Sequence, residues 1–204
     1  MPLIAKGVYA DCGDMAFEIE TTYYLNFQIL SSLVSLERLD LYDDRFWWEN
    51  RFQYYHYYCD HLLFSIGQIS NRFIITSRDR NHTIKERKRF NSTNYQFVEH
   101  VFPILSDKRA RNMMEHIDEH NQSIIESHHG VGGFNLIDTE TDSDLANDLR
   151  SRRDTHPYTL DLVRRELLLR WKNDDVTISL EKLRDELLAL QSNVKSFAKI
   201  ISGF

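Results

Sequence analysis

The segment from Met15 to Asp40, MAFEIETTYYLNFQILSSLVSLERLD, decides the fold class of this chain. Apolar side chains recur in it every three or four positions, and neither glycine nor proline interrupts the run. A repeat of this period is typical of an amphipathic α-helix. The segment therefore predicts one long helix, with apolar positions that include Phe17, Tyr24, Phe27, Leu30 and Val34.

A second long helix is predicted to follow, from a cap at Asp43 or Asp44 to about Ile75. Its apolar positions are Trp47, Phe52, Tyr55, Leu62, Leu63, Ile66 and Ile69. Aromatic residues between positions 46 and 58 lie all round this helix, which is more than one core-facing side requires. We expect part of this aromatic cluster to cover a second layer or a partner subunit. A platform on which nucleic-acid bases stack is the alternative.

The composition changes after this helix. Residues 77–94, SRDRNHTIKERKRFNSTN, are polar and basic, and they predict a loop or a mobile basic helix. Residues 93–105, TNYQFVEHVFPIL, predict a short helix that stops near Pro103. Ser106 or Asp107 is then expected to cap a further helix that continues to the glycines of GVGG at 130–133.

The last third of the chain predicts strands and one helix. GGFNLID at 132–138 is typical of a strand, and 139–157 form a polar, charged excursion. LLLRWKNDDVTI at 167–178 predicts a hairpin with its turn at Asn173 and Asp174, although a helix over 160–171 is the alternative. An amphipathic helix is expected from Ser179 onward.

These elements predict a mainly α fold: an antiparallel helical bundle with a small antiparallel β-sheet or hairpin in the C-terminal third. We divide the chain into a helical part (1–130), a small β extension (131–178) and a C-terminal helix that packs back on the bundle (179–204). Together these parts are expected to form one domain.

Composition narrows the possible functions. The chain has 204 residues and a formal net charge of −6, so any contact with nucleic acid must use a local basic patch. Only Cys12 and Cys59 occur, and neither belongs to a CxxC pair, which argues against a disulfide framework or a zinc knot. We see no signal peptide and no apolar run of membrane-spanning length, so we expect a cytoplasmic protein without a membrane partner.

Chemistry is suggested by RNMMEH at 111–116. A histidine can take or give a proton near neutral pH, and an arginine can hold a phosphate in a fork of donors. Such groups suit the cleavage of RNA by its own 2′-hydroxyl, which needs neither a metal nor a cofactor. We therefore expect His116 as the acid/base, Arg111 as the phosphate clamp and Asn112 as the residue that orients them. Six basic residues would bind the RNA backbone: Arg78, Arg80, Lys85, Arg87, Lys88 and Arg89.

The RNMMEH segment resembles the Arg-x4-His motif of the HEPN superfamily, in which a polar residue follows the arginine. The longer form RNMMEHIDE is similar to an RNxxEHxDE motif of bacterial HEPN-like proteins. The resemblance implies a helical bundle that dimerises and places two motifs face to face. It also implies a metal-independent endoribonuclease of a toxin–antitoxin or phage-defence system, with RNA, a second copy and an antitoxin or other protein as partners.

Simpler interpretations remain open. Arg111 and Glu115 are four residues apart and can form an ion pair within a helix. His116 and His120 share a helical face, but the HExxH order of zinc proteases is absent, so we predict no metal site. Acidic residues at 115, 118 and 119 place negative charge where a phosphate would bind. The alternative function is therefore a non-catalytic HEPN-like module that binds a nucleotide, RNA or a protein partner.

Overall fold

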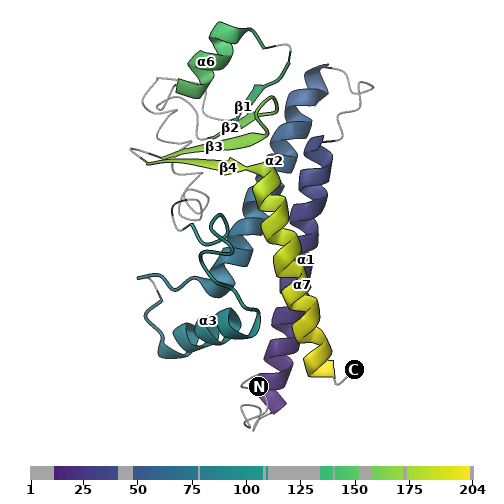
Figure 1. Cartoon of the computed structure of the whole chain (residues 1–204), viewed down its shortest axis with the longest axis vertical. Helices are drawn as coiled ribbons and strands as arrows, with labels where there is room; N and C mark the ends of the chain where they lie inside the picture. The colour runs from purple at the N-terminus through teal and green to yellow at the C-terminus, as the bar shows by residue number, and fades with distance from the viewer. Residues whose placement is uncertain are drawn as a thin grey trace.

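A computed structural model describes residues 12–40, 48–77, 79–107, 109, 134–139, 141–151, 158–171 and 174–202. Three long helices lie along the long axis of the molecule: α1 (Cys12–Asp40), α2 (Trp48–Phe73) and α7 (Leu180–Ser202) (Figure 1). A sheet lies beside one end of α2, and the shorter helix α3 (His82–Asn94) lies toward its other end. The prediction of a mainly helical chain with a small sheet late in the sequence is confirmed.

Helix α1 is the central element, because both α2 and α7 pack against it. Leu25, Ile29 and Leu36 of α1 are fully buried, as the long apolar run of this segment requires. Polar contacts set the register with α2: Tyr24 donates a hydrogen bond to Gln68 at 2.8 Å. Further along, Tyr54 donates to the Arg38 carbonyl, so α1 and α2 run in opposite directions.

The predicted apolar face of α1 is wrong in one respect. Phe27, Leu30 and Val34 are 65%, 44% and 49% exposed, whereas the core-facing positions are Leu25, Ile29, Leu36 and Leu39. The helix therefore carries two apolar sides, and only one of them packs against described parts of the chain. Helical periodicity alone cannot say which of two apolar sides becomes the core.

Helix α2 agrees with its predicted position. Tyr55, Leu62, Leu63, Ile66 and Ile69 are buried in the core. The expected cap at Asp43 or Asp44 and the expected core residue Trp47 lie outside the described residues. Phe52 is 44% exposed, and its ring packs edge-on against Phe134 of the sheet at 5.1 Å between centroids.

The sheet has four strands in the order β1 (Phe134–Ile137), β2 (Tyr158–Asp161), β3 (Glu166–Trp171) and β4 (Asp174–Ser179). The β3–β4 pair is antiparallel, with Trp171 opposite Asp174, so the predicted hairpin strands are confirmed and the alternative helix over 160–171 is wrong. The predicted antiparallel sheet is corrected to a mixed one, because β1 and β2 are parallel. A parallel pair needs a crossover, and helix α6 (Ser143–Ser151) lies in it, inside the stretch predicted as a polar excursion.

A buried carboxylate fixes the tight connection from β2 to β3. The side chain of Asp161 has no exposed surface, and its Oδ2 lies 2.7 Å from Nε of Arg150 in α6. Its Oδ1 accepts the backbone N–H of Arg164 at 3.0 Å. The next residue, Arg165, has a φ of 55°, an unusual value for a non-glycine residue. Asp161 thus joins the crossover helix to the turn that reverses the chain.

The short helix predicted over 93–105 does not form. Helix α3 ends at Asn94, Gln96 has a φ of 53°, and residues 95–107 run as a series of turns. Phe97 explains this path, because its ring stacks on Phe73 at 4.2 Å and on Phe102 at 4.9 Å. These core contacts require an irregular backbone, so tertiary packing overrides the local helical pattern.

Glu186 of α7 holds these turns in place. Its buried carboxylate accepts backbone N–H groups of Ile104 and Leu105, each at 2.9 Å. Burial raises the pKa of this carboxyl above its ordinary value, and the two N–H bonds oppose part of that rise. The C-terminal helix therefore positions the segment that leads into residue 107.

Helix α7 confirms the predicted amphipathic C-terminal helix, with Leu183, Leu187 and Leu190 fully buried. The division of the chain into residues 1–130, 131–178 and 179–204 stays a prediction. In the described ranges, no helix combines the length and the apolar character that a bilayer crossing requires.

Candidate functional site

The predicted catalytic residues Arg111, Asn112 and His116 lie outside the described residues. The same holds for His120, the GVGG stretch and the basic residue Arg78. The structure does describe the residues on which this segment begins, together with most of the basic residues that precede it.

Asp107 has the geometry of a helix cap. Its Oδ1 accepts the backbone N–H of Arg109 at 2.8 Å, which is the bond that a capping carboxylate makes with the first turn of a helix. The Arg109 guanidinium also contacts the Asp107 carboxylate at 2.9 Å. Of the two caps that the sequence suggested, Ser106 and Asp107, Asp107 makes this bond.

A hollow of about 580 Å³ lies beside this cap. Its walls come from the end of α2 and from the turns before residue 109: Phe73, Ile74, Ile75, Phe97, Glu99, Pro103, Ser106, Asp107 and Arg109. The volume falls in the range of small-molecule sites, and the walls combine apolar surface with charged groups of both signs. The surface beside Asp107, where the predicted catalytic segment is expected to begin, is therefore concave rather than flat.

The basic residues of the predicted RNA patch separate into two kinds. Arg80, Arg87 and Arg89 are exposed, and Lys85 is half-buried. Lys85 and Arg89 are four residues apart on α3, so they share a face of that helix. The described part of the predicted patch can therefore present positive charge from Arg80, Lys85, Arg87 and Arg89.

Lys88 corrects the prediction, because it is buried and does not belong to an exposed basic surface. Its ammonium donates to both Asp79 carboxylate oxygens, at 3.0 and 2.9 Å, and to the Ile74 carbonyl at 2.9 Å. The lysine thus holds the loop between α2 and α3 closed. Partial burial would raise the pKa of Asp79, but hydrogen bonds from Thr76 and Lys88 lower it to about 2.

A second group of reactive side chains lies where α2 meets the sheet. The His56 Nε2 is 3.4 Å from Asp60 Oδ2, and the Tyr158 hydroxyl donates a hydrogen bond to Asp60 Oδ1. The His56 ring stacks on Phe134 at 5.2 Å and is partly exposed. Burial raises the pKa of Tyr158, and the Asp60 carboxylate raises it further, so the tyrosine stays a hydrogen-bond donor.

This His56–Asp60–Tyr158 cluster can orient an imidazole whose side chain is 40% exposed. Sequence reasoning did not identify it. The spacing of four between His56 and Asp60 could have revealed the first pair on a predicted helix. The third member could not be found in this way, because Tyr158 is far away in the sequence and reaches α2 only through the fold of the sheet.

Comparison with known proteins returned no match to a family model, a curated protein or a solved structure. Among the described side chains, no group of three or more His, Cys, Asp or Glu is placed to hold a metal ion.

Proposed function

We propose that the chain is a HEPN-like helical protein that cleaves RNA without a metal ion, as part of a bacterial toxin or phage-defence system. The resemblance of residues 111–116 to the Arg-x4-His motif suggests the activity. The observation that supports the proposal is the capping bond at Asp107, because a helix that carries the motif is expected to begin at a cap in this position. A helix from this cap would place Arg111 near its first turn and His116 one to two turns later.

The proposed chemistry is transfer of a phosphodiester within the RNA. His116 removes the proton from a 2′-hydroxyl, whose oxygen then attacks the neighbouring phosphorus. The bond from phosphorus to the 5′-oxygen breaks, and a 2′,3′-cyclic phosphate forms. Arg111 stabilises the charge that builds on the phosphate oxygens, and Asn112 orients the reacting groups. The leaving oxygen takes its proton from a second acid, for which a second copy of the motif in a dimer is the natural source.

The basic side chains of α3 and of the loop before it support RNA binding by this site. Residues Arg80, Lys85, Arg87 and Arg89 precede the capping residue in the chain and offset an acidic total charge. Phosphate contacts of this kind do not read sequence, but they release counterions and make binding depend on salt.

The double variant Lys85→Ala/Arg89→Ala should therefore bind single-stranded RNA more weakly than the parent. If each side chain contacts one phosphate, the slope of log binding constant against log salt should fall by roughly 1.4 in magnitude. Fluorescence anisotropy across a salt series measures this slope. The matched control is Arg164→Ala/Lys182→Ala, which removes two exposed cations elsewhere and should leave the slope unchanged. Equal slopes for the parent and for both double variants would contradict an RNA-binding role for α3.

The activity is tested by incubating the parent chain with total cellular RNA in EDTA. We expect cleavage products that end in a 2′,3′-cyclic phosphate and a 5′-hydroxyl, because the 2′-hydroxyl is the nucleophile. A matching DNA should stay intact, since it lacks that group. Intact RNA in this assay, or cleavage that EDTA abolishes, would remove the proposal of a metal-independent ribonuclease.

The second candidate is a non-catalytic HEPN-like module that binds a nucleotide, RNA or a protein partner, such as an antitoxin. The observation that favours it is the exposed apolar side of α1, which includes Tyr23 and Phe27 at 73% and 65% exposure. Large apolar side chains in a row on a surface mark interaction sites. RNA binding without cleavage, by both the parent and a His116→Ala variant, would favour this candidate.

A further inference from the structure

The outer side of α1 carries a continuous apolar row. Its members are Ile19, Tyr23, Phe27, Leu30 and Val34, and their exposed fractions run from 40% to 73%. The intervals between them are four, four, three and four residues, which keeps them within one narrow stripe about 22 Å long. The buried Leu25, Ile29 and Leu36 lie on the opposite side of the helix, so this row is not part of the core.

Helix α2 extends this row sideways. Tyr57 and Phe64 are 58% and 60% exposed, and they flank His61, whose Nδ1 lies 3.4 Å from Ser31 Oγ of α1. The two helices thus present one surface, which we call the α1–α2 apolar face: the five α1 residues with Tyr57 and Phe64. No element in the described ranges covers it.

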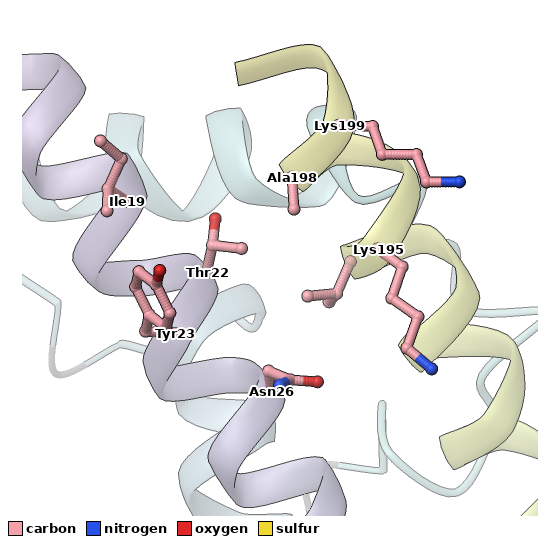
Figure 2. Close-up of a pocket in the computed structure, with 8 residues that line it drawn as sticks. Ile19, Thr22, Tyr23, Asn26, Lys195, Ala198 and Lys199 are labelled. Carbon is pink, nitrogen blue, oxygen red and sulfur yellow. The ribbon is translucent and has the colours of Figure 1, made fainter. Parts of the chain in front are cut away.

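The groove between α1 and α7 lies at one edge of this face. It has a volume of about 470 Å³, and its apolar walls are Ile19 and Tyr23 of α1 with Val194 and Ala198 of α7. Figure 2 shows the Asn26 side chain directed toward α7, with Lys195 on the opposite wall. The apolar face therefore ends in a recess that can receive a side chain from a partner.

We propose that a second copy of this chain covers the α1–α2 apolar face, with the two α1 helices antiparallel about a two-fold axis near Phe27. The stripe is self-complementary in this arrangement. A two-fold axis that passes between residues 26 and 27 brings Ile19 of one copy opposite Val34 of the other, and Tyr23 of one copy opposite Leu30 of the other. A two-fold interface requires this property, because the same patch must serve both copies. A parallel pairing would instead bring Glu20 and Glu37 against their own copies.

The size of the face agrees with a stable dimer. With about 150–250 Å² for a fully accessible aromatic side chain and somewhat less for an aliphatic one, the exposed fractions of these seven residues leave on the order of 800 Å² open. A specific interface of standard size buries about 800 Å² from each partner.

The proposed dimer rests on the proposed function in one respect, namely that the second acid of the cleavage reaction comes from the motif of a second copy. The test of the dimer does not involve RNA. Sedimentation equilibrium of the full chain should give the mass of a dimer. Phe27→Glu should raise the dimer dissociation constant on the order of 100-fold or more, since the symmetry places the buried charge twice at the centre of the interface. Circular dichroism should stay unchanged, because Phe27 lies on the surface.

The matched control is Val163→Glu, which introduces the same charge at a 55% exposed position in the β2–β3 turn and should leave the dimer intact. Leu30→Ser is a milder variant that should weaken the dimer without adding a charge. For the orientation, Ile19→Cys chains mixed with Val34→Cys chains, both with Cys12→Ser, should cross-link to each other through a short bis-maleimide. Ile19→Cys alone should not.

A monomeric parent, or Phe27→Glu and Val163→Glu dimers of equal strength, would overturn the interface. Cross-linking of Ile19→Cys to itself would overturn its antiparallel orientation. A dimeric parent that does not cleave RNA would support the interface and contradict the ribonuclease proposal. A monomeric parent that cleaves RNA would support the ribonuclease proposal and contradict the interface.

Discussion

A chain carrying His116→Ala should cleave RNA at least about 100-fold more slowly than the parent, since a positioned acid or base contributes about 10²–10⁴ to a rate. Alanine cannot remove the 2′-hydroxyl proton or return a proton to the leaving oxygen. Binding of RNA to the basic side chains of α3 should persist, because these do not involve the imidazole. Single-turnover cleavage of a labelled RNA in EDTA measures the rate, and anisotropy on the same RNA measures the affinity.

The most informative control is His120→Ala, because it removes an imidazole one turn further along the same predicted helix. His82→Ala is a second control, at an exposed position of α3 where the imidazole pairs with Glu86 at 2.9 Å. Both variants should retain the parent rate. Equal rates for His116→Ala and the parent would exclude His116 as the acid/base, and loss of cleavage in all three variants would show that histidine substitution acts through folding or binding.

Replacing Lys88 with alanine should lower the free energy of unfolding by about 3 kcal/mol, because it leaves a partner charge without compensation in a largely buried place. The side chains of Lys88 and Asp79 are only 9% and 13% exposed. Without the ammonium, the Asp79 carboxylate and the Ile74 carbonyl lose the bonds that close the loop between α2 and α3. Urea denaturation followed by circular dichroism measures the change.

The pH dependence of this effect has a definite sign. The pKa of Asp79 is about 2 in the folded chain, below its ordinary value of 3.8, so its ionised form stabilises the fold above pH 4. That contribution is lost as the pH falls from about 4 toward 2. The difference in stability between the parent and Lys88→Ala should therefore be largest near pH 6 and should narrow as the pH is lowered through this window.

Lys85→Ala is the matched control, since it removes a cation from the same helix at a half-buried position with more access to water. Its effect on the free energy of unfolding should stay within about 0.5 kcal/mol. A Lys88→Ala variant as stable as Lys85→Ala would mean that Lys88 is not an anchor of the loop. A loss of stability that does not depend on pH would mean that Asp79 is not the partner that matters.

Local patterns in the sequence predicted the elements whose identity depends on neighbouring residues. The apolar repeats of residues 15–40 and 179–202 became α1 and α7, and the hairpin predicted over 167–178, with a helix as its alternative, became strands β3 and β4. The cap at Asp107 could also be anticipated, because a capping carboxylate bonds a residue only two positions away. Each of these features needs only contacts between residues close in the chain.

The candidate site was predictable to a smaller extent. Sequence composition identified the basic run before the motif, but it could not separate Lys88, which is buried and bound by Asp79, from Arg89, which is exposed. It also missed the His56–Asp60–Tyr158 cluster, because Tyr158 reaches Asp60 from a strand that is remote in the sequence. Whether a charge is exposed or compensated depends on what the fold brings beside it.

The sequence by itself determined that this chain is mainly helical, since helical periodicity is a property of each segment. Only the tertiary structure decided that β1 and β2 run parallel and that residues 95–107 form turns rather than a helix. It also decided that α1 buries Leu25 and Ile29 and leaves Phe27 and Leu30 exposed. The physical reason is the same in each case. The local sequence pattern allows two arrangements in each case. Burial of side chains that are distant in the sequence against one another makes one of the two lower in free energy.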